Sequence, residues 1–135
     1  GDLKVDEHHT VEDTAIVLGE CFAKALGSKK GIERYGFALP MDDAKAEVLL
    51  DFGGRTWLEW GVTLKREYVG DFPTEMARHF FASFCQSGLC NLHISAQGEN
   101  THHILEAVFK AFARTVRQAI RQTGGGIPSS KGCLA

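Results

Sequence analysis

Two short clusters of residues with metal-ligand chemistry stand out in this chain. The first is His8-His9-Thr10-Val11-Glu12, and the second is His102-His103-Ile104-Leu105-Glu106. Residues four apart lie on one face of a helix, whereas adjacent residues diverge by about 100° around its axis. We therefore expect the first histidine and the glutamate of each cluster to bind one ion, while the second histidine points toward a different ion. Mixed nitrogen and oxygen ligands suit manganese, although zinc or iron could occupy them.

The apolar residues that follow each cluster keep the same register, with the steps of three and four typical of an amphipathic helix. They correspond as Val11/Leu105, Ala15/Phe109, Leu18/Phe112, Phe22/Val116, Ala25/Ala119 and Leu26/Ile120. The helix is therefore predicted to be duplicated. Two such helices that faced each other would make two related sites, each with a histidine and a glutamate from one helix and a histidine from the other. One isolated histidine pair could equally be polar surface, but the repeat in register argues against that.

The first of these helices is predicted from about His8 to Leu26, with Gly27 as its C-terminal stop. Residues 3–5 are interpreted as the end of a strand. Between residues 37 and 69 the pattern changes to strands, interpreted as antiparallel with a two-residue turn at Gly53-Gly54: residues 46–52, 56–60 and 62–68.

A second helix is predicted after Pro73, with Thr74 as its N-cap and Gly88 just beyond its end. Its buried stripe is expected to be Met76, Phe80 and Phe84. Residues 91–96 alternate as a strand in which His93 faces solvent, and a third helix follows and ends near Gly124. The order strands, helix, strand, helix predicts an α+β unit.

Other residues have two interpretations each. His79, on the second helix, is either a histidine satisfied by a backbone group or an extra metal ligand. The glycine-rich tail, residues 124–132, is either a flexible end or a phosphate-holding segment, and it is not a Walker loop. Lys110 lies four residues after Glu106, so it either forms a helix-stabilising ion pair or reaches a substrate. Arg34 and Arg55 are further anion-binding candidates.

Composition narrows the class of protein. The 135 residues suit one domain, and a net charge of −2 gives no general attraction to nucleic acid or to anionic membranes. No run is long and apolar enough to span a bilayer, and no signal-peptide pattern opens the chain. The four cysteines, Cys21, Cys85, Cys90 and Cys133, form no C-x-x-C pair. Reduced thiols in the cytoplasm are the simplest expectation.

Several segments in combination resemble the imidazoleglycerol-phosphate dehydratases, and the resemblance covers essentially the whole chain. They are Gly1-Asp2 with His8-His9-Thr10-Val11-Glu12-Asp13, Gly31-Ile32-Glu33-Arg34-Tyr35-Gly36, Pro40-Met41-Asp42, His102-His103-x-x-Glu106-x-x-Phe109-Lys110-Ala111, and Pro128-Ser129-Ser130-Lys131-Gly132. The similarity is strongest to the dehydratase part of the bifunctional enterobacterial enzymes, which carry a histidinol-phosphatase domain upstream.

The resemblance implies dehydration of D-erythro-imidazoleglycerol phosphate to imidazole acetol phosphate in histidine biosynthesis, with two Mn²⁺ ions per active site. It implies a cytoplasmic homo-oligomer of twenty-four subunits built from trimers. The implied fold is α+β, ribosomal S5 domain 2-like, with duplicated units of a four-stranded, mainly antiparallel sheet and two helices. Residues 1–27 would end the first unit, 36–123 would form the second, and 124–135 would be a substrate-binding tail. The family's preceding strand and helix, with a further histidine and glutamate, would be missing, which leaves the first unit incomplete.

The resemblance also assigns roles to residues. The implied metal ligands are His8, His9, Glu12, His79, His102, His103 and Glu106. The implied substrate and phosphate contacts are Arg34, Arg55, Lys110, Ser129 and Lys131. As catalytic base, Glu12 and Glu106 are equivalent in the repeat; the resemblance and the neighbouring Lys110 favour Glu106. Two other functions stay open from the residues: a metal-assembled scaffold without catalysis, and a metal-dependent hydrolase.

Overall fold

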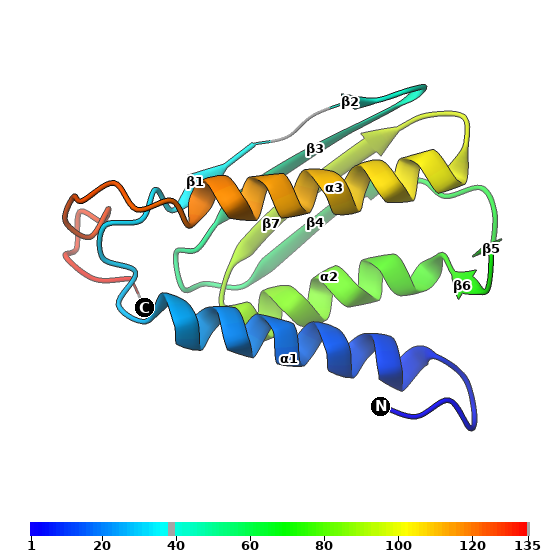
Figure 1. The fold of residues 1–135 in the computed structure, drawn as a ribbon, viewed down its shortest axis with the longest axis horizontal. Helices are drawn as coiled ribbons and strands as arrows, with labels where there is room; N and C mark the ends of the chain where they lie inside the picture. Colours follow the sequence, from blue (N-terminus) through cyan, green and yellow to red (C-terminus); the bar gives the residue numbers. More distant parts are fainter. Residues whose placement is uncertain (38–39, 135) are drawn as a thin grey trace.

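The computed structural model describes residues 1–37 and 40–134. The elements follow in the order α1 (His8–Leu26), β1 (Tyr35–Gly36), β2 (Pro40–Met41), β3 (Ala44–Asp51), β4 (Trp57–Val62), β5 (Tyr68–Val69), β6 (Phe72–Pro73), α2 (Glu75–Gly88), β7 (Asn91–Gln97) and α3 (Thr101–Ala119). Figure 1 shows α3 lying across the sheet, α2 beside it and α1 against α2. The expected α+β class is confirmed.

The main sheet has the order β1-β3-β7-β4, and β2 pairs with the same edge of β3 as β1. Strands β3 and β7 are antiparallel, whereas β4 and β7 are parallel. The predicted antiparallel neighbours 46–52 and 56–60 are therefore wrong as a pair, because β7 lies between them. Strand β7 alternates buried and outward residues and occupies the centre, whereas β4 has no fully buried residue, as suits an edge strand.

The hydrophobic core lies between the sheet and the helices. Every second residue of the two central strands is buried toward the helices: Ala44, Ala46, Val48, Leu50, Leu92, Ile94 and Ala96. On α2, Met76 and Phe84 are buried as predicted, whereas Phe80 is half-buried and its neighbour Phe81 is fully buried, so the predicted stripe is confirmed in part. Helix α1 reaches the same core through Phe22, whose ring centroid lies 5.7 Å from that of Phe84. The outward sheet face carries exposed residues, His93 among them, as predicted.

Several element boundaries differ from the prediction. Helix α1 spans the predicted residues, but α3 ends at Ala119 rather than near Gly124. The reason is that residues 119–123 exchange backbone hydrogen bonds with the loop at residues 31–34, for example Arg34 N–H to the Ala119 carbonyl at 2.9 Å. Residues 3–5 form no strand. Thr74 is the N-cap residue of α2, as predicted, but its side chain makes no capping hydrogen bond, because its hydroxyl donates to the Arg66 carbonyl.

The predicted strand over residues 62–68 is also absent: β4 ends at Val62, and only the short β5 begins at Tyr68 and pairs with β6. All four cysteines are free, with Cys85 and Cys90 buried. Among the described residues, no helix has the length and apolar character needed to cross a membrane.

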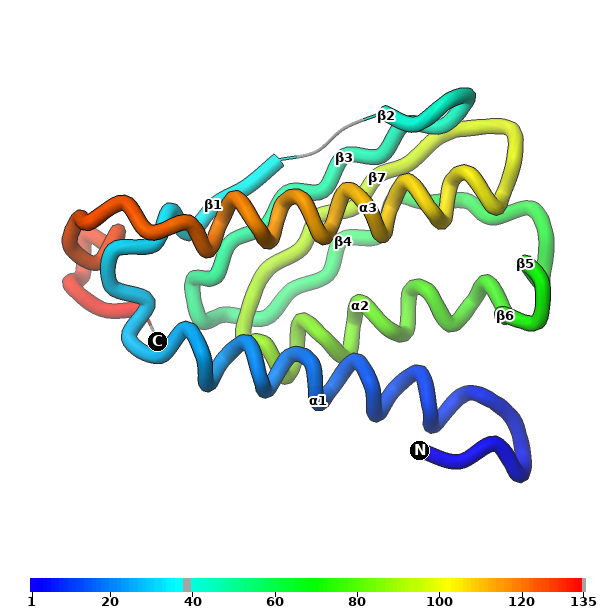
Figure 2. The backbone as a smooth tube through the Cα atoms, viewed as in Figure 1, coloured from blue at the N-terminus to red at the C-terminus, as the bar shows by residue number. Residues whose placement is uncertain are grey.

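The three helices all begin at the same end of the molecule (Figure 1). The backbone tube in Figure 2 shows that the C-terminal segment lies at the opposite end, beside the loop that follows α1. Hydrogen bonds from Gly31 N–H to the Gly126 carbonyl and from Thr123 N–H to the Gly31 carbonyl join these two segments. The fold therefore separates the two histidine clusters from the glycine-rich tail.

Candidate metal centre

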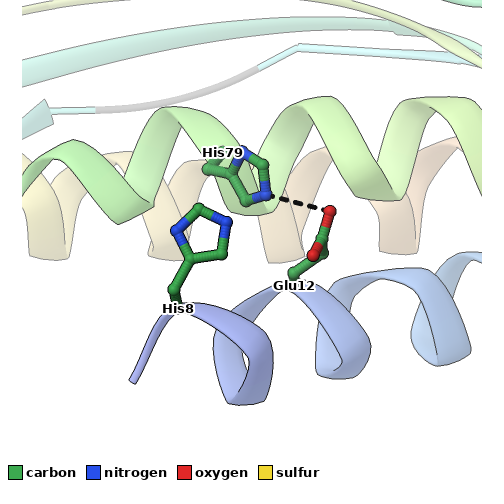
Figure 3. Close-up of side chains that lie close together, drawn as sticks. All are labelled: His8, Glu12 and His79. Atoms are coloured by element: carbon green, nitrogen blue, oxygen red, sulfur yellow. Dashed lines mark ion pairs between the residues drawn. The ribbon is translucent and has the colours of Figure 1, made fainter. Parts of the chain in front are cut away.

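The first cluster is completed by a histidine from the neighbouring helix. His8 and Glu12 lie one turn apart at the start of α1, and His79 faces them from α2 (Figure 3). One ligand atom from each residue lies within 4.8 Å of the other two. The ring centroids of His8 and His79 are 4.6 Å apart, and His79 Nε2 lies 3.2 Å from Glu12 Oε1. These three donors converge on one point.

The donor set fits a divalent cation. Among the described residues, His79 Nε2 is a buried side-chain polar atom that makes no hydrogen bond, although Glu12 Oε1 is close enough for an ion pair. A buried polar atom without a hydrogen bond is costly. Two imidazole nitrogens and a carboxylate oxygen are ligands that manganese, iron and zinc accept, so an ion between them would satisfy all three groups. The interpretation of His79 as a backbone-satisfied histidine therefore has no support in the geometry.

Close approach of α1 and α2 makes this convergence possible. Gly19 lies where the helices cross, and a Cβ built there would come within 2.7 Å of the Gly88 nitrogen and 2.8 Å of the Phe84 carbonyl oxygen. Within the chain, the helix that faces α1 is thus α2, rather than the duplicated helix α3. His79, and not a histidine of the second cluster, accordingly completes the trio.

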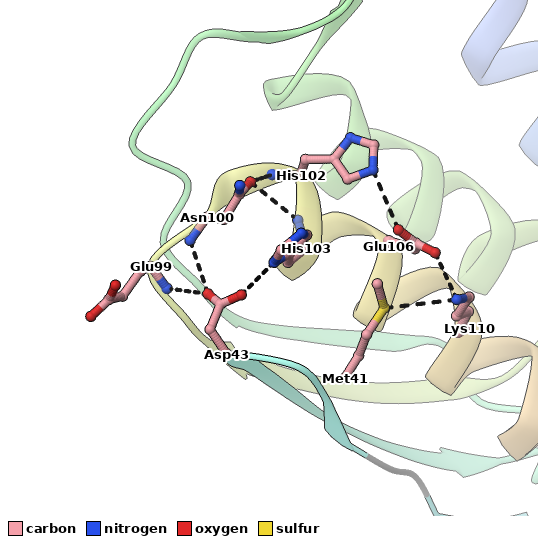
Figure 4. A network of polar contacts seen from close by, with 8 residues as sticks. All are labelled: Met41, Asp43, Glu99, Asn100, His102, His103, Glu106 and Lys110. Carbon is pink, nitrogen blue, oxygen red and sulfur yellow. Dashed lines mark hydrogen bonds and ion pairs between the residues drawn. The ribbon is translucent and has the colours of Figure 1, made fainter.

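In the second cluster the histidine and the glutamate one turn apart contact each other directly. His102 Nε2 lies 3.3 Å from Glu106 Oε2, and the Lys110 ammonium lies 2.6 Å from Glu106 Oε1 (Figure 4). The hydrogen bond from Lys110 lowers the pKa of Glu106, so that this carboxylate is ionised at neutral pH. The ion pair expected from the spacing of these two residues is present.

The two rings of each histidine pair are steeply inclined to each other, and each ring has its own neighbours. The rings of His8 and His9 are at 86° to each other, and those of His102 and His103 are at 76°. His103 Nδ1 contacts Asp43, in the turn between β2 and β3 (Figure 4). That hydrogen bond raises the pKa of His103 and, with two backbone N–H donors, lowers the pKa of Asp43. Sequence reasoning did not include Asp43.

The expected anion-binding residues fall into two groups. The Arg34 guanidinium donates to Asp51 Oδ2 at 3.0 Å and to the Pro128 carbonyl at 2.7 Å, and so holds the tail. Ser129 follows at once, and its hydroxyl accepts from Lys131 N–H at 3.2 Å. Arg55 is exposed in the loop between β3 and β4, where its carbonyl accepts from Asn91.

Lys110 lies midway along α3, beside Glu106 and Met41. From Lys110 to Ala119, where the loop carrying Arg34 contacts the helix, the axis runs about 14 Å. Within one chain, the structure therefore does not bring all five predicted anion-binding residues together.

Comparison with known proteins identifies the family. The family model described as imidazoleglycerol-phosphate dehydratase matches residues 1–116. This chain belongs to the imidazoleglycerol-phosphate dehydratase family. It is 56% identical over 137 residues to the histidine biosynthesis bifunctional protein HisB of Spirosoma linguale, and 57% identical over 136 residues to that of Bacteroides fragilis. Each match covers 99% of this chain and 36% of the relative, so the chain spans little more than a third of these relatives' length.

Solved structures of the family share the fold. The crystal structure of imidazoleglycerol-phosphate dehydratase from Staphylococcus aureus superposes with a TM-score of 0.84 at 38% identity, over 90% of this chain and 72% of that one. The Pyrococcus furiosus enzyme, in complex with (S)-C348, gives 0.84 at 31% identity, over 95% and 72% of the two chains. The resemblance first recognised from the residues is thereby confirmed, including the similarity to the dehydratase part of bifunctional proteins.

Proposed function

We propose that this chain provides the dehydratase centre that converts imidazoleglycerol phosphate to imidazole acetol phosphate in histidine biosynthesis. The observation that carries the proposal is the convergence of His8, Glu12 and His79, which joins the sequence cluster to a helix far along the chain. Membership of the dehydratase family and the names of the relatives support the same reaction.

The proposed metal ligands are the seven residues that the resemblance implied: His8, His9, Glu12, His79, His102, His103 and Glu106. Two manganese ions are proposed, because adjacent residues of a helix diverge by about 100° and the two histidines of each pair have different neighbours. When bound, manganese supplies Lewis acidity that disperses the negative charge developing on the substrate's imidazole ring.

Proton removal is assigned to Glu106. The proton that must leave is attached to carbon, and a positioned carboxylate can accept it. Glu106 is an ionised carboxylate and can accept a proton, and the Lys110 ammonium beside it favours a negatively charged substrate nearby, although its hydrogen bond also lowers the pKa of Glu106. Loss of the hydroxyl group as water then leaves an enol, which becomes the ketone of the product. Glu12 is the alternative base, but it has no comparable lysine contact among the described residues.

The phosphate group is assigned to Arg34, Arg55, Ser129 and Lys131, with Lys110 nearer the reacting carbon. Guanidinium, ammonium and hydroxyl groups are suitable donors to phosphate oxygens. Because the tail and the histidine clusters lie at opposite ends of α3, we propose that a complete site combines groups from different subunits of a homo-oligomer. Twenty-four subunits built from trimers is the assembly that the family resemblance suggests.

The test is turnover of imidazoleglycerol phosphate by the full-length protein with and without manganese. Imidazole acetol phosphate is expected to form only with the metal bound. Release of inorganic phosphate in place of that product would indicate a hydrolase. Manganese binding and assembly without turnover would indicate a scaffold, and either result would contradict the proposal.

A further inference from the structure

Asp43 holds three groups at the start of α3. Its Oδ2 accepts from the backbone N–H groups of Glu99 at 2.8 Å and Asn100 at 3.1 Å, and its Oδ1 contacts His103 Nδ1 (Figure 4). The pairing of β3 with β7 explains the approach, because the register Lys45↔Gln97 brings the turn before β3 beside the loop after β7. One carboxylate therefore fixes both the helix start and one imidazole ring.

The first cluster has a matching arrangement with a different chain path. His9, which corresponds to His103 in the repeat, has its Nδ1 3.8 Å from Asp2 Oδ2. Asp2 reaches this position from the segment just before α1, where its carbonyl accepts from the Thr10 hydroxyl at 2.9 Å. Asp43, by contrast, comes from a turn 60 residues before its histidine. An aspartate is thus the carboxylate nearest Nδ1 of the second, or outer, histidine in both copies: it is hydrogen-bonded to His103 but 3.8 Å from His9.

The consequence for the ring follows from imidazole chemistry. A neutral imidazole carries one N–H, and an aspartate beside Nδ1 favours the proton there. The lone pair then lies on Nε2, which is free to bind a metal, and the ring is held in one orientation. A carboxylate placed behind a metal-binding histidine in this way also increases its strength as a ligand, and its loss typically costs about 10–100-fold in metal affinity.

We propose that Asp43 is a positioning residue that presents His103 Nε2 to a divalent metal ion, and that Asp2 does the same for His9. This rests on the proposed function, because it takes the two outer histidines as metal ligands. Neither aspartate touches the ion; each acts through its histidine.

The test uses Asp43→Asn in the full-length protein. An amide has a single carbonyl oxygen, which can accept from the backbone at the start of α3 or from His103, but not from both as the carboxylate does. The variant is compared with His103→Gln and with the double variant, with the Mn²⁺ dissociation constant read by electron paramagnetic resonance. Melting of the metal-free protein is measured in parallel. Asp42→Asn is the matched control, since it removes the same charge from the same turn at a residue that makes no side-chain hydrogen bond among those described.

We expect Asp43→Asn to weaken Mn²⁺ binding about 10–100-fold, and to add nothing in the His103→Gln background, because it acts through that ring. Asp42→Asn should change affinity less than twofold. Unchanged affinity in Asp43→Asn overturns the proposal. So does a loss equally large without His103, which would mean that Asp43 acts only by holding α3.

Should Asp43→Asn fail to fold, the same comparison of two single variants with the double variant is made with Asp2→Asn and His9→Gln, and it decides whether the aspartate acts through its histidine. Among the described residues, the side chain of Asp2, unlike that of Asp43, accepts no hydrogen bond from the backbone at the start of a helix. The proposed function fails on a different result, namely the absence of manganese-dependent turnover in the unaltered protein. An unchanged manganese affinity in His103→Gln would remove that ligand from the site and the positioning role with it.

Discussion

Glu106 and its counterpart in the repeat, Glu12, have different surroundings. The two oxygens of Glu106 contact His102 on one side and Lys110 on the other, whereas Glu12 faces His79 across α1 and α2. We expect Glu106→Gln to reduce turnover by about 10²–10⁴-fold, because the amide cannot accept the carbon-bound proton. The measurement is exchange of that proton with solvent at saturating manganese, which separates proton removal from weaker metal binding.

Glu99→Gln is the control for this variant, because the Glu99 side chain is exposed in the loop before α3 and points away from the cluster (Figure 4). It should exchange and turn over normally. Normal proton exchange in a fully metal-loaded Glu106→Gln protein would show that Glu106 is not the base and would direct attention to Glu12.

Lys131 offers a test of the phosphate assignment. Its side chain is exposed, and its backbone is held by Ser129 in the tail that Arg34 anchors. Lys131→Ala should raise the Michaelis constant about tenfold or more, as expected for the loss of a hydrogen bond to a charged group, and should leave bound manganese unchanged. Lys24→Ala, an equally simple loss of an exposed lysine on α1, is the control. An unaltered Michaelis constant and turnover rate in Lys131→Ala would remove it from the site.

Residue spacing predicted which candidate ligands of one helix lie close together, and it failed where the contact is purely tertiary. The pairing of His8 with Glu12, and of His102 with Glu106, follows from helical geometry alone. From the sequence, a role as metal ligand was one of two interpretations of His79. Its distance from His8, 4.6 Å between the ring centroids, depends on how α2 packs against α1. Asp43 gave no signal, because nothing in the local sequence connects a turn before β3 with a ring on α3; the sheet register makes that connection.

At the scale of elements, the crossing of α1 and α2 controls the metal centre. Gly19→Ala places a methyl group against the Gly88 nitrogen and the Phe84 carbonyl oxygen. Both are backbone atoms, so a side-chain rotation cannot relieve the clash. We expect a loss of about 1–3 kcal/mol of stability, typical of overpacking, and weaker manganese binding as His8 and Glu12 move away from His79. Melting of the metal-free protein and the Mn²⁺ dissociation constant are the two measurements.

Val17→Ala removes apolar volume from the same helix at a residue that is 57% exposed, so it should change neither quantity appreciably. If Gly19→Ala melts and binds manganese as the unaltered protein does, the helices have room to separate and the crossing does not set the site.

Element prediction succeeded where amphipathic periodicity is strong and failed where the partner is distant in sequence. The span of α1 was predicted to the residue, because its apolar stripe and Gly27 both mark its extent. The neighbour of β4 was not predicted correctly, because Gly53-Gly54 resembles a hairpin turn. The actual parallel partner, β7, comes after α2 in the sequence. The end of α3 was not predicted correctly, because no local stop signal marks it. Instead, backbone N–H groups of the loop at residues 31–34 donate hydrogen bonds to the carbonyl groups at the end of the helix.

At the scale of the whole molecule, the proposed ions connect segments that are far apart along the chain. His8 and Glu12 come from α1 and His79 from α2, so an ion held by all three would cross-link the two helices. A ligand that binds only the folded state stabilises it by mass action, by about 2.7 kcal/mol at a hundredfold excess over the dissociation constant. Manganese should therefore raise the melting temperature of the full-length protein, and a chelator should reverse the shift.

The contribution of the α1–α2 centre to that shift can be isolated by substitution. His79→Ala removes the ligand from α2, so its metal-dependent rise in melting temperature should be smaller than that of the unaltered protein, because the ion would no longer bridge the helices. His93→Ala is the matched control: His93 is also a single histidine, but it lies on the exposed outward face of β7, away from both clusters. It should keep the full shift. If His79→Ala retained the whole manganese-dependent rise, the ion would not join α1 to α2, and the role of His79 as a ligand would have to be abandoned.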